Sequence, residues 1–75
     1  METNNGIIKE LLNEREKQDE KFGIQNHIDS KWIAILGEEF GEICKAYTEN
    51  LLIREEILQS AAVCVAWLEA IDRRI

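Results

Sequence analysis

The segment from Ile57 to Ala66 constrains the fold most, because as a helix it would be apolar on nearly every side. Its only polar residues are Gln59 and Ser60. A helix that is apolar nearly all round has to be buried nearly all round. Two partner helices from one chain of 75 residues cannot cover it. We therefore expect a homo-oligomer, a dimer or a tetramer, in which two copies share a four-helix core.

The rest of the chain also predicts helices and no strands. It contains no proline, and its β-branched residues do not form alternating runs. We expect three helices, over residues 5–21, 29–48 and 51–73. Gly23 is a typical stop for the first helix, and Asp29 or Ser30 is expected to cap the second helix and Asn50 the third. Because the connections are short, we expect a single all-α domain over residues 1–75, an antiparallel bundle in which consecutive helices are neighbours.

The charge and hydropathy of the chain argue against nucleic acids and membranes as partners. A formal net charge of −6 disfavours non-specific binding of DNA or RNA, which needs a basic surface. No apolar run reaches the roughly 20 residues that span a bilayer, and the polar start, Met1 to Asn5, does not resemble a signal peptide. We therefore expect a cytoplasmic protein without a nucleic-acid or membrane partner. Cys44 and Cys64 form no zinc motif and are expected to be reduced and buried.

Polar side chains stand in the middle of three apolar lines whose members are spaced four, three and four residues apart. The lines are Leu11-Arg15-Gln18-Phe22, Ile35-Glu39-Glu42-Ala46 and Leu52-Glu56-Gln59-Val63. This spacing places each line on one face of a helix. Carboxylates in such a line would enter a helix contact, where an unpaired charge is costly. A bound cation would remove that cost, and a cluster of oxygen ligands suits magnesium, manganese or calcium.

Four glutamates are the candidates for this cluster. Glu39 and Glu42 lie on adjacent turns of one face, and Glu38 can lean in from the flank because it precedes Glu42 by four residues. If the second and third helices pack antiparallel, Glu56 faces them. Acidic strings of this kind also occur on solvated helix faces, so a surface role remains the alternative for these four residues.

Other side chains near these lines have both a structural and a functional interpretation. Arg15 could pair with one of the acids, or it could hold a phosphate, which a guanidinium matches well. Trp32 could be a core or interface residue, and His27 a solvated loop residue, but an aromatic ring beside an acidic metal site is also a natural platform for a base. Lys31 is either a surface charge or a phosphate ligand.

Several stretches resemble the MazG-like nucleotide pyrophosphohydrolases of the all-alpha NTP pyrophosphatase group. They are residues 32–42 (WIAILGEEFGE), residues 54–59 (REEILQ) and residues 18–23 (QDEKFG), the last similar to short stand-alone members. The family pattern is EExxE, a gap of one to two dozen residues, and ExxD. Here 13 residues separate Glu42 from Glu56. The resemblance extends from about Glu14 to Asp72 and departs from the pattern at Gln59, where the family has an aspartate.

The resemblance implies a helical bundle assembled from a dimer or a dimer of dimers. It implies magnesium-dependent hydrolysis of nucleoside triphosphates, often deoxy forms, to the monophosphate and pyrophosphate. Glu39, Glu42 and Glu56 match the metal-binding positions, Glu38 matches the first acid of the motif, and Gln59 can offer only a neutral carbonyl oxygen. Manganese could replace magnesium.

A division of roles follows from this hypothesis. Glu39 or Glu38 would position or deprotonate the attacking water. The remaining candidates would contact the substrate: Arg15, Lys21 and Lys31 at the phosphates, Trp32 and His27 at the base or sugar, and Gln18 beside them. The neutral Gln59 and the short chain favour an alternative, a catalytically weak or inactive homo-oligomer that binds nucleotides. A further alternative is a plain helical interaction module that happens to be acidic.

Overall fold

The computed structural model describes residues 4–74, and this part of the chain consists of three α-helices and no strands. They are α1 (Asn5–Phe22), α2 (Asp29–Thr48) and α3 (Ile53–Arg73). The prediction of an all-helical chain with three helices is confirmed. None of these helices is long and apolar enough to cross a membrane within the described range. The expectation about the polar start of the chain rests partly on residues 1–3, which lie outside that range.

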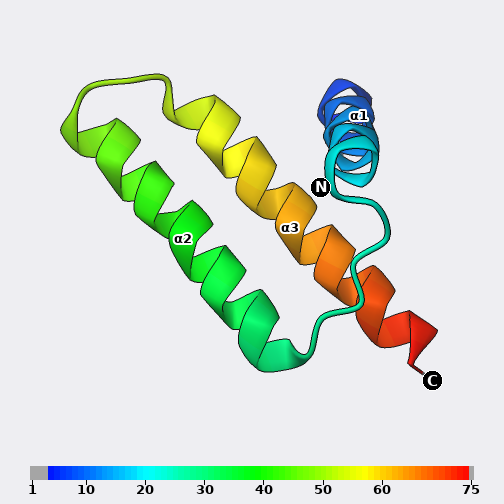
Figure 1. Ribbon diagram of the computed structural model, residues 1–75. Coiled ribbons are helices and arrows are strands. Elements are labelled where there is room, and N and C mark those ends of the chain that lie inside the picture. Colours follow the sequence, from blue (N-terminus) through cyan, green and yellow to red (C-terminus); the bar gives the residue numbers. More distant parts are fainter. Residues whose placement is uncertain (1–3, 75) are drawn as a thin grey trace.

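The central helix is α3, which packs against α2 on one side and α1 on the other. Figure 1 shows α2 and α3 side by side with opposite directions, and α1 nearly end-on beyond α3. The prediction of antiparallel neighbours holds for α2 and α3 but is wrong for α1 and α2, whose backbones do not approach each other in residues 4–74. The connection between them crosses the end of α3, where Arg73 donates hydrogen bonds to the side chain of Asn26 (2.6 Å) and the carbonyl of Gln25 (3.1 Å).

The core lies between α2 and α3 and combines one large side chain with small ones. Trp32 of α2 is 1% exposed and packs with Val63, Ala66 and Ala70 of α3. Alanine side chains let the two helix axes approach closely, and the indole ring fills the remaining space. The small residues of α3 therefore fix the distance between the two helices that carry the predicted acids.

Both ends of α1 carry typical local signals, of which the sequence analysis predicted the one at the C-terminal end. The side chain of Asn4 accepts hydrogen bonds from the backbone N–H groups of Gly6 (2.8 Å) and Ile7 (3.3 Å), which is a typical N-cap. At the other end, Gly23 has φ 72°, a left-handed conformation that a side chain would disfavour. The stop predicted at Gly23 is confirmed.

The predicted cap of α2 is wrong. The N-cap residue is Ile28, which has no polar side chain, and Asp29 already belongs to the first turn. Its carboxylate instead accepts hydrogen bonds from Trp67 Nε1 (2.9 Å) and from Arg74. Asp29, which the local pattern predicted as a cap, therefore makes a tertiary contact with Trp67 of α3 and with Arg74 instead.

The predicted cap of α3 is also wrong. The helix begins at Ile53, and its N-cap is the apolar Leu52. Asn50 has φ 59° and lies in the turn after α2, where asparagine tolerates the left-handed conformation. The backbone N–H of Leu51 donates to the carbonyl of Ala46 (2.8 Å), which closes that turn.

Both cysteines are exposed, so the prediction that they are buried is wrong. Cys44 of α2 lies one turn from Phe40, which is 62% exposed, and Cys64 of α3 lies one turn from Leu68, which is 60% exposed. Among residues 4–74, α3 packs against α1 and α2, and α2 packs against α3 alone, so one side of each helix is left open.

We predict that Ala62→Leu lowers the free energy of unfolding by roughly 1–3 kcal/mol, because Ala62 is 0% exposed and a larger side chain would push the helices apart. The matched control is Ala34→Leu on the exposed side of α2, which should change stability by less than about 0.5 kcal/mol. Urea denaturation followed by circular dichroism measures both. Equal effects of the two substitutions would contradict the packing described here.

Candidate functional site

Two adjoining pockets open where α1 and α2 diverge on either side of α3. The larger pocket has a volume of about 380 Å³ and lies among α1, the connection to α2, α2 and α3. The smaller has a volume of about 200 Å³ and lies beside it toward the middle of α1. Gln18, Phe22 and Glu39 line both pockets. The two spaces are therefore parts of one site, with Glu39 at their junction.

Most of the residues predicted from the sequence line these pockets. Those in the larger pocket are Gln18, His27, Lys31, Trp32, Glu38 and Glu39. Those in the smaller pocket are Gln18, Lys21, Glu39 and Gln59. Arg15, Glu42 and Glu56 line neither pocket. Each of the three apolar lines therefore contributes at least one polar side chain to the pockets, namely Gln18, Glu39 and Gln59.

The acids of the site differ in exposure. Glu39 of α2 and Glu56 of α3 are half-buried, whereas Glu38 and Glu42 are exposed. Burial of the carboxylate, followed by the negative charges of Glu56, Glu42, Glu38 and Glu14, raises the pKa of Glu39. Its Oε2 atom is buried and has no hydrogen-bond partner. Glu39 is therefore an uncompensated carboxylate surrounded by like charges from all three helices.

These carboxylates are near neighbours but are not in coordinating positions. Across residues 4–74, no three histidine, cysteine, aspartate or glutamate side chains are arranged so that they could hold a metal ion as they stand. The backbone positions of Glu39 and Glu56 are fixed by the α2–α3 contact. Coordination of a cation would therefore require rotation of glutamate side chains toward the junction of the pockets.

Arg15 makes ion pairs outside the predicted acidic cluster. Its guanidinium contacts Glu69 of α3 (2.6 Å) and Asp19 of α1 (2.9 Å), and its Nη1 donates to Gln18 Oε1 (3.1 Å). These contacts tie α1 to α3. They also orient Gln18, whose carbonyl oxygen is taken by Arg15, so that its NH₂ group is the part available to a ligand.

Trp32 belongs to the core and to the wall of the larger pocket at once. Its ring centroid lies 5.1 Å from that of His27, with the two planes tilted by 60°. His27 Nε2 lies 3.2 Å from the side-chain amide nitrogen of Gln25. The buried indole Nε1 of Trp32 has no hydrogen-bond partner. Both interpretations of Trp32, core residue and ligand platform, are compatible with this position.

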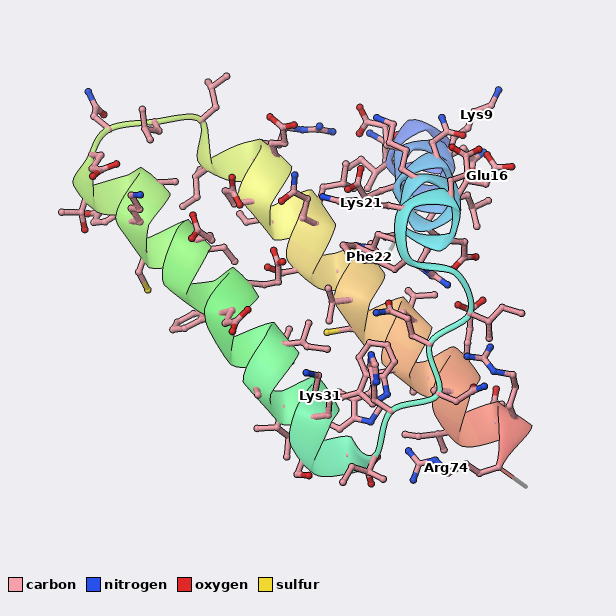
Figure 2. The ribbon with its side chains drawn as sticks, in the orientation of Figure 1. Lys9, Glu16, Lys21, Phe22, Lys31 and Arg74 are labelled. Carbon is pink, nitrogen blue, oxygen red and sulfur yellow. The ribbon has the colours of Figure 1, made fainter. Side chains whose placement is uncertain are left out.

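The cations of the site come from α1 and from the start of α2. Figure 2 shows Lys21 and Phe22 on the side of α1 that faces the other helices, Lys31 at the start of α2, and Lys9 and Glu16 on the outer side of α1. Lys21 Nζ lies 5.1 Å from the centroid of the Phe22 ring. The site therefore combines positive charge on α1 and α2 with negative charge at its centre.

Sequence analysis did not identify two residues of the smaller pocket, Glu14 and Lys17. Neither residue stands in one of the three apolar lines with four-three-four spacing. A signal for Glu14 was nevertheless present, because Glu14, Gln18 and Lys21 are spaced four and three residues apart and share one face of α1. Lys17 precedes Lys21 by one turn on the same flank.

In comparisons of the chain with protein families, with characterised proteins and with solved structures, no family, relative or structure matched. The resemblance to the MazG-like pyrophosphohydrolases therefore stays a prediction. What can be argued about function rests on the residues that line the two pockets.

The raised pKa of Glu39 gives a testable dependence of stability on pH. Because folding raises this pKa above the ordinary value of 4.5, the folded state loses stability as pH rises through that range. Glu39→Gln should therefore raise the melting temperature at pH 7, and the gain should disappear below pH 4.5, where Glu39 is protonated anyway. Glu20→Gln, at an exposed position of α1, is the control and should lack this pH-dependent gain. A destabilised Glu39→Gln variant at pH 7 would contradict the argument.

Proposed function

We propose that this protein is a magnesium-dependent nucleoside triphosphate pyrophosphohydrolase that converts an NTP or dNTP to the monophosphate and pyrophosphate. One observation carries the proposal. In residues 4–74, two buried side-chain polar atoms lack a hydrogen-bond partner, Trp32 Nε1 and Glu39 Oε2, and both residues line the larger pocket. Since buried polar groups are normally paired, a ligand that offers an acceptor to the indole and a cation to the carboxylate suits this pocket.

The residues around Glu39 fit a divalent cation by their chemistry. The unpartnered Oε2 atom and the raised pKa of Glu39 indicate a carboxylate that lacks a counter-charge. Glu39 and Glu56 would hold the ion, with Glu42 and the carbonyl oxygen of Gln59 as further oxygen donors. Magnesium, or manganese in its place, would neutralise negative charge that develops on the phosphates during hydrolysis.

The two pockets offer separate places for the parts of a nucleotide. Trp32 and His27 would contact the base or sugar in the larger pocket, where the indole N–H can donate to a carbonyl oxygen. Gln18 presents its NH₂ group at the boundary. Lys21 and Lys31 would bind the phosphates, and Arg15 would take part only if it released Glu69 or Asp19, with which it is now paired.

The acids at the junction can carry the hydrolytic step. Glu39 or Glu38 would orient a water molecule and accept its proton as the water oxygen attacks the α-phosphorus. The bond from the α-phosphorus to the bridging oxygen then breaks, and pyrophosphate leaves with the bonding electrons. A carboxylate whose pKa is raised accepts a proton more readily, which favours Glu39 for this role.

A second copy of the chain is the proposed cover for the open apolar side of α2 and α3. The exposed apolar residues there are Ile33, Phe40 and Tyr47 on α2, spaced seven apart, and Ile57, Cys64 and Leu68 on α3. The chain exposes 5918 Å², roughly a quarter more than the ~4,700 Å² of a compact monomer of this mass. The excess is sufficient for one side of a stable dimer, which buries about 800 Å² per partner or more. Pairing of these faces would give the shared four-helix core.

A second candidate function is a nucleotide-binding homo-oligomer with weak or no catalysis. The observation that favours it is Gln59, a neutral amide on the wall of the smaller pocket. An amide oxygen contributes less to cation binding than a carboxylate. This candidate shares the pocket and the fold with the first and differs only in turnover.

We predict that the protein with Mg²⁺ releases pyrophosphate from at least one member of a panel of NTPs and dNTPs. Glu39→Gln should lower the rate by roughly 10²–10⁴-fold, because it removes a proton acceptor and cation ligand. Glu16→Gln, on the outer side of α1 (Figure 2), should match the wild type.

Absence of turnover with every nucleotide would remove the enzyme proposal. If calorimetry nevertheless detected binding of a non-hydrolysable triphosphate, the nucleotide-binding oligomer would take its place. If the protein showed neither turnover nor binding, and its melting did not respond to magnesium or nucleotide, both proposals would fail, since a ligand bound only by the folded state must stabilise it.

We predict that light scattering gives the mass of a dimer or tetramer and that Phe40→Asp shifts the protein toward monomers. Loss of a central aromatic side chain from an interface typically costs about 2 kcal/mol or more, and a buried aspartate adds to that cost. Ala34→Asp adds the same charge at an exposed position of α2 outside the apolar stripe and should leave the mass unchanged. A wild-type monomer at micromolar concentration would refute the oligomer.

A further inference from the structure

We propose that Arg73, at the end of α3, positions one wall of the larger pocket by holding the connection between α1 and α2. The inference rests on the proposed function and deepens it, because it names a residue that sets the affinity for the nucleotide without touching the nucleotide. Arg73 lines neither pocket, and its side chain donates hydrogen bonds to Asn26 and Gln25 of the connection.

The side chains of the connection alternate between the pocket and the solvent. Gln25 and His27 are half-buried and line the larger pocket, whereas Ile24, Asn26 and Ile28 are exposed. This alternation is typical of an extended chain, in which neighbouring side chains point to opposite sides. The inner edge of the connection is therefore a wall of the pocket, and its outer edge faces away from the ligand.

Arg73 binds the connection at two points that leave the inner side chains free. Its Nε donates to Asn26 Oδ1 (2.6 Å), and its Nη2 donates to the backbone carbonyl oxygen of Gln25 (3.1 Å). Figure 1 shows the connection passing the C-terminal part of α3, the helix that carries Arg73. Because a guanidinium presents its donors in one rigid plane, the two bonds fix both the place and the direction of the segment.

Few other contacts hold this segment. In residues 4–74, no hydrogen bond between backbone groups involves residues 24–27. Both isoleucines of the connection are largely exposed, so burial of apolar surface contributes little there. The helices on either side, α1 and α2, do not pack against each other. The connection is therefore held by the ring contact of His27 with Trp32 on its inner side and by Arg73 on its outer side.

The contacts continue from the connection into the pocket. The side-chain amide nitrogen of Gln25 lies 3.2 Å from His27 Nε2, and the ring centroid of His27 lies 5.1 Å from that of Trp32. All three side chains line the larger pocket. Without Arg73 the connection is free to move away from Trp32, and only the fraction of molecules that keeps the wall in place binds the nucleotide with full affinity.

The first measurement follows His27 without any ligand. His27 is the only histidine of the chain, so one imidazole signal in the proton NMR spectrum, recorded at one pH for all variants, reports the contact with the Trp32 ring. Arg73→Gln and Asn26→Ala should each move this signal toward that of a free histidine. Arg74→Gln removes the same charge from the same end of the chain and should leave the signal unchanged, because Arg74 pairs with the first residue of α2.

The second measurement separates affinity from chemistry. It uses Mg²⁺ and the nucleotide of the panel that the wild type hydrolyses fastest. Arg73→Gln should raise KM about fivefold, the result expected when the pinned arrangement falls to about a fifth of the population. The kcat value should change by less than about twofold, because the acids at the junction of the pockets are untouched. Arg74→Gln should keep the wild-type KM, and circular dichroism checks that all variants remain helical.

Asn26→Ala tests whether the lost charge of Arg73 explains the result. This substitution removes the acceptor of the 2.6 Å bond without changing the net charge, and Asn26 lines neither pocket. It should raise KM nearly as much as Arg73→Gln does, and the double variant should be no worse than Arg73→Gln, because both changes break the same contact. A wild-type KM for Asn26→Ala beside a raised KM for Arg73→Gln would mean that Arg73 acts through its charge, and the inference would be wrong.

The inference and the proposed function can fail separately. An unmoved His27 signal or an unchanged KM in Arg73→Gln would overturn the role of Arg73 and leave the hydrolase proposal intact. A wild-type protein that turns over no nucleotide would overturn the hydrolase proposal, and the His27 signal would still decide whether Arg73 holds the wall of the pocket.

Discussion

The packing of two helices on opposite sides of α3 is the constraint on which the rest of the structure depends. Because α1 and α2 both contact α3 and do not approach each other in the described residues, a wedge-shaped space remains between them. Val63 and Ala66 form part of its floor, and their small size keeps Trp32 of α2 close to α3. A compact three-helix bundle would have closed this space, and the two pockets would not exist.

Most of the charges that join the helices are paired, but the carboxylate at the centre of the pockets is not. Arg15, Arg54 and Arg74 each pair with an acid from a distant part of the chain. The Arg54 and Arg74 pairs are exposed and contribute little energy, whereas the Arg15 side chain is largely shielded from solvent. The centre of the wedge is different, because Glu39 is partly desolvated, surrounded by like charges and unpaired at Oε2. Local departures of this kind are expected at functional sites and are compensated elsewhere in the fold.

Features of this structure that depend on nearby residues were predicted better from the sequence than features that depend on tertiary contacts. The three helices and the stop at Gly23 follow from periodicity and backbone preference, which act over a few residues. The caps of α2 and α3, the exposed cysteines and the separation of α1 from α2 depend on which distant segments meet. Asp29 illustrates the difference, because its carboxylate binds Trp67 and Arg74 rather than the start of its own helix. Glu14 escaped prediction because its burial comes from the wedge, and no apolar line marks it.

The geometry of α3 separates the proposed site from the proposed interface. Gln59 and Ala66 line the pockets, whereas Ile57 and Leu68 lie about half a turn round the helix, among the exposed apolar residues. A second copy on the apolar side would clamp α2 against α3 and so fix the spacing of Glu39 and Glu56, without closing the mouth of the wedge. The position of α1 then differs from that of its partners, because in the described residues it contacts α3 and not α2, and it brings Gln18 and Lys21 to the pocket walls.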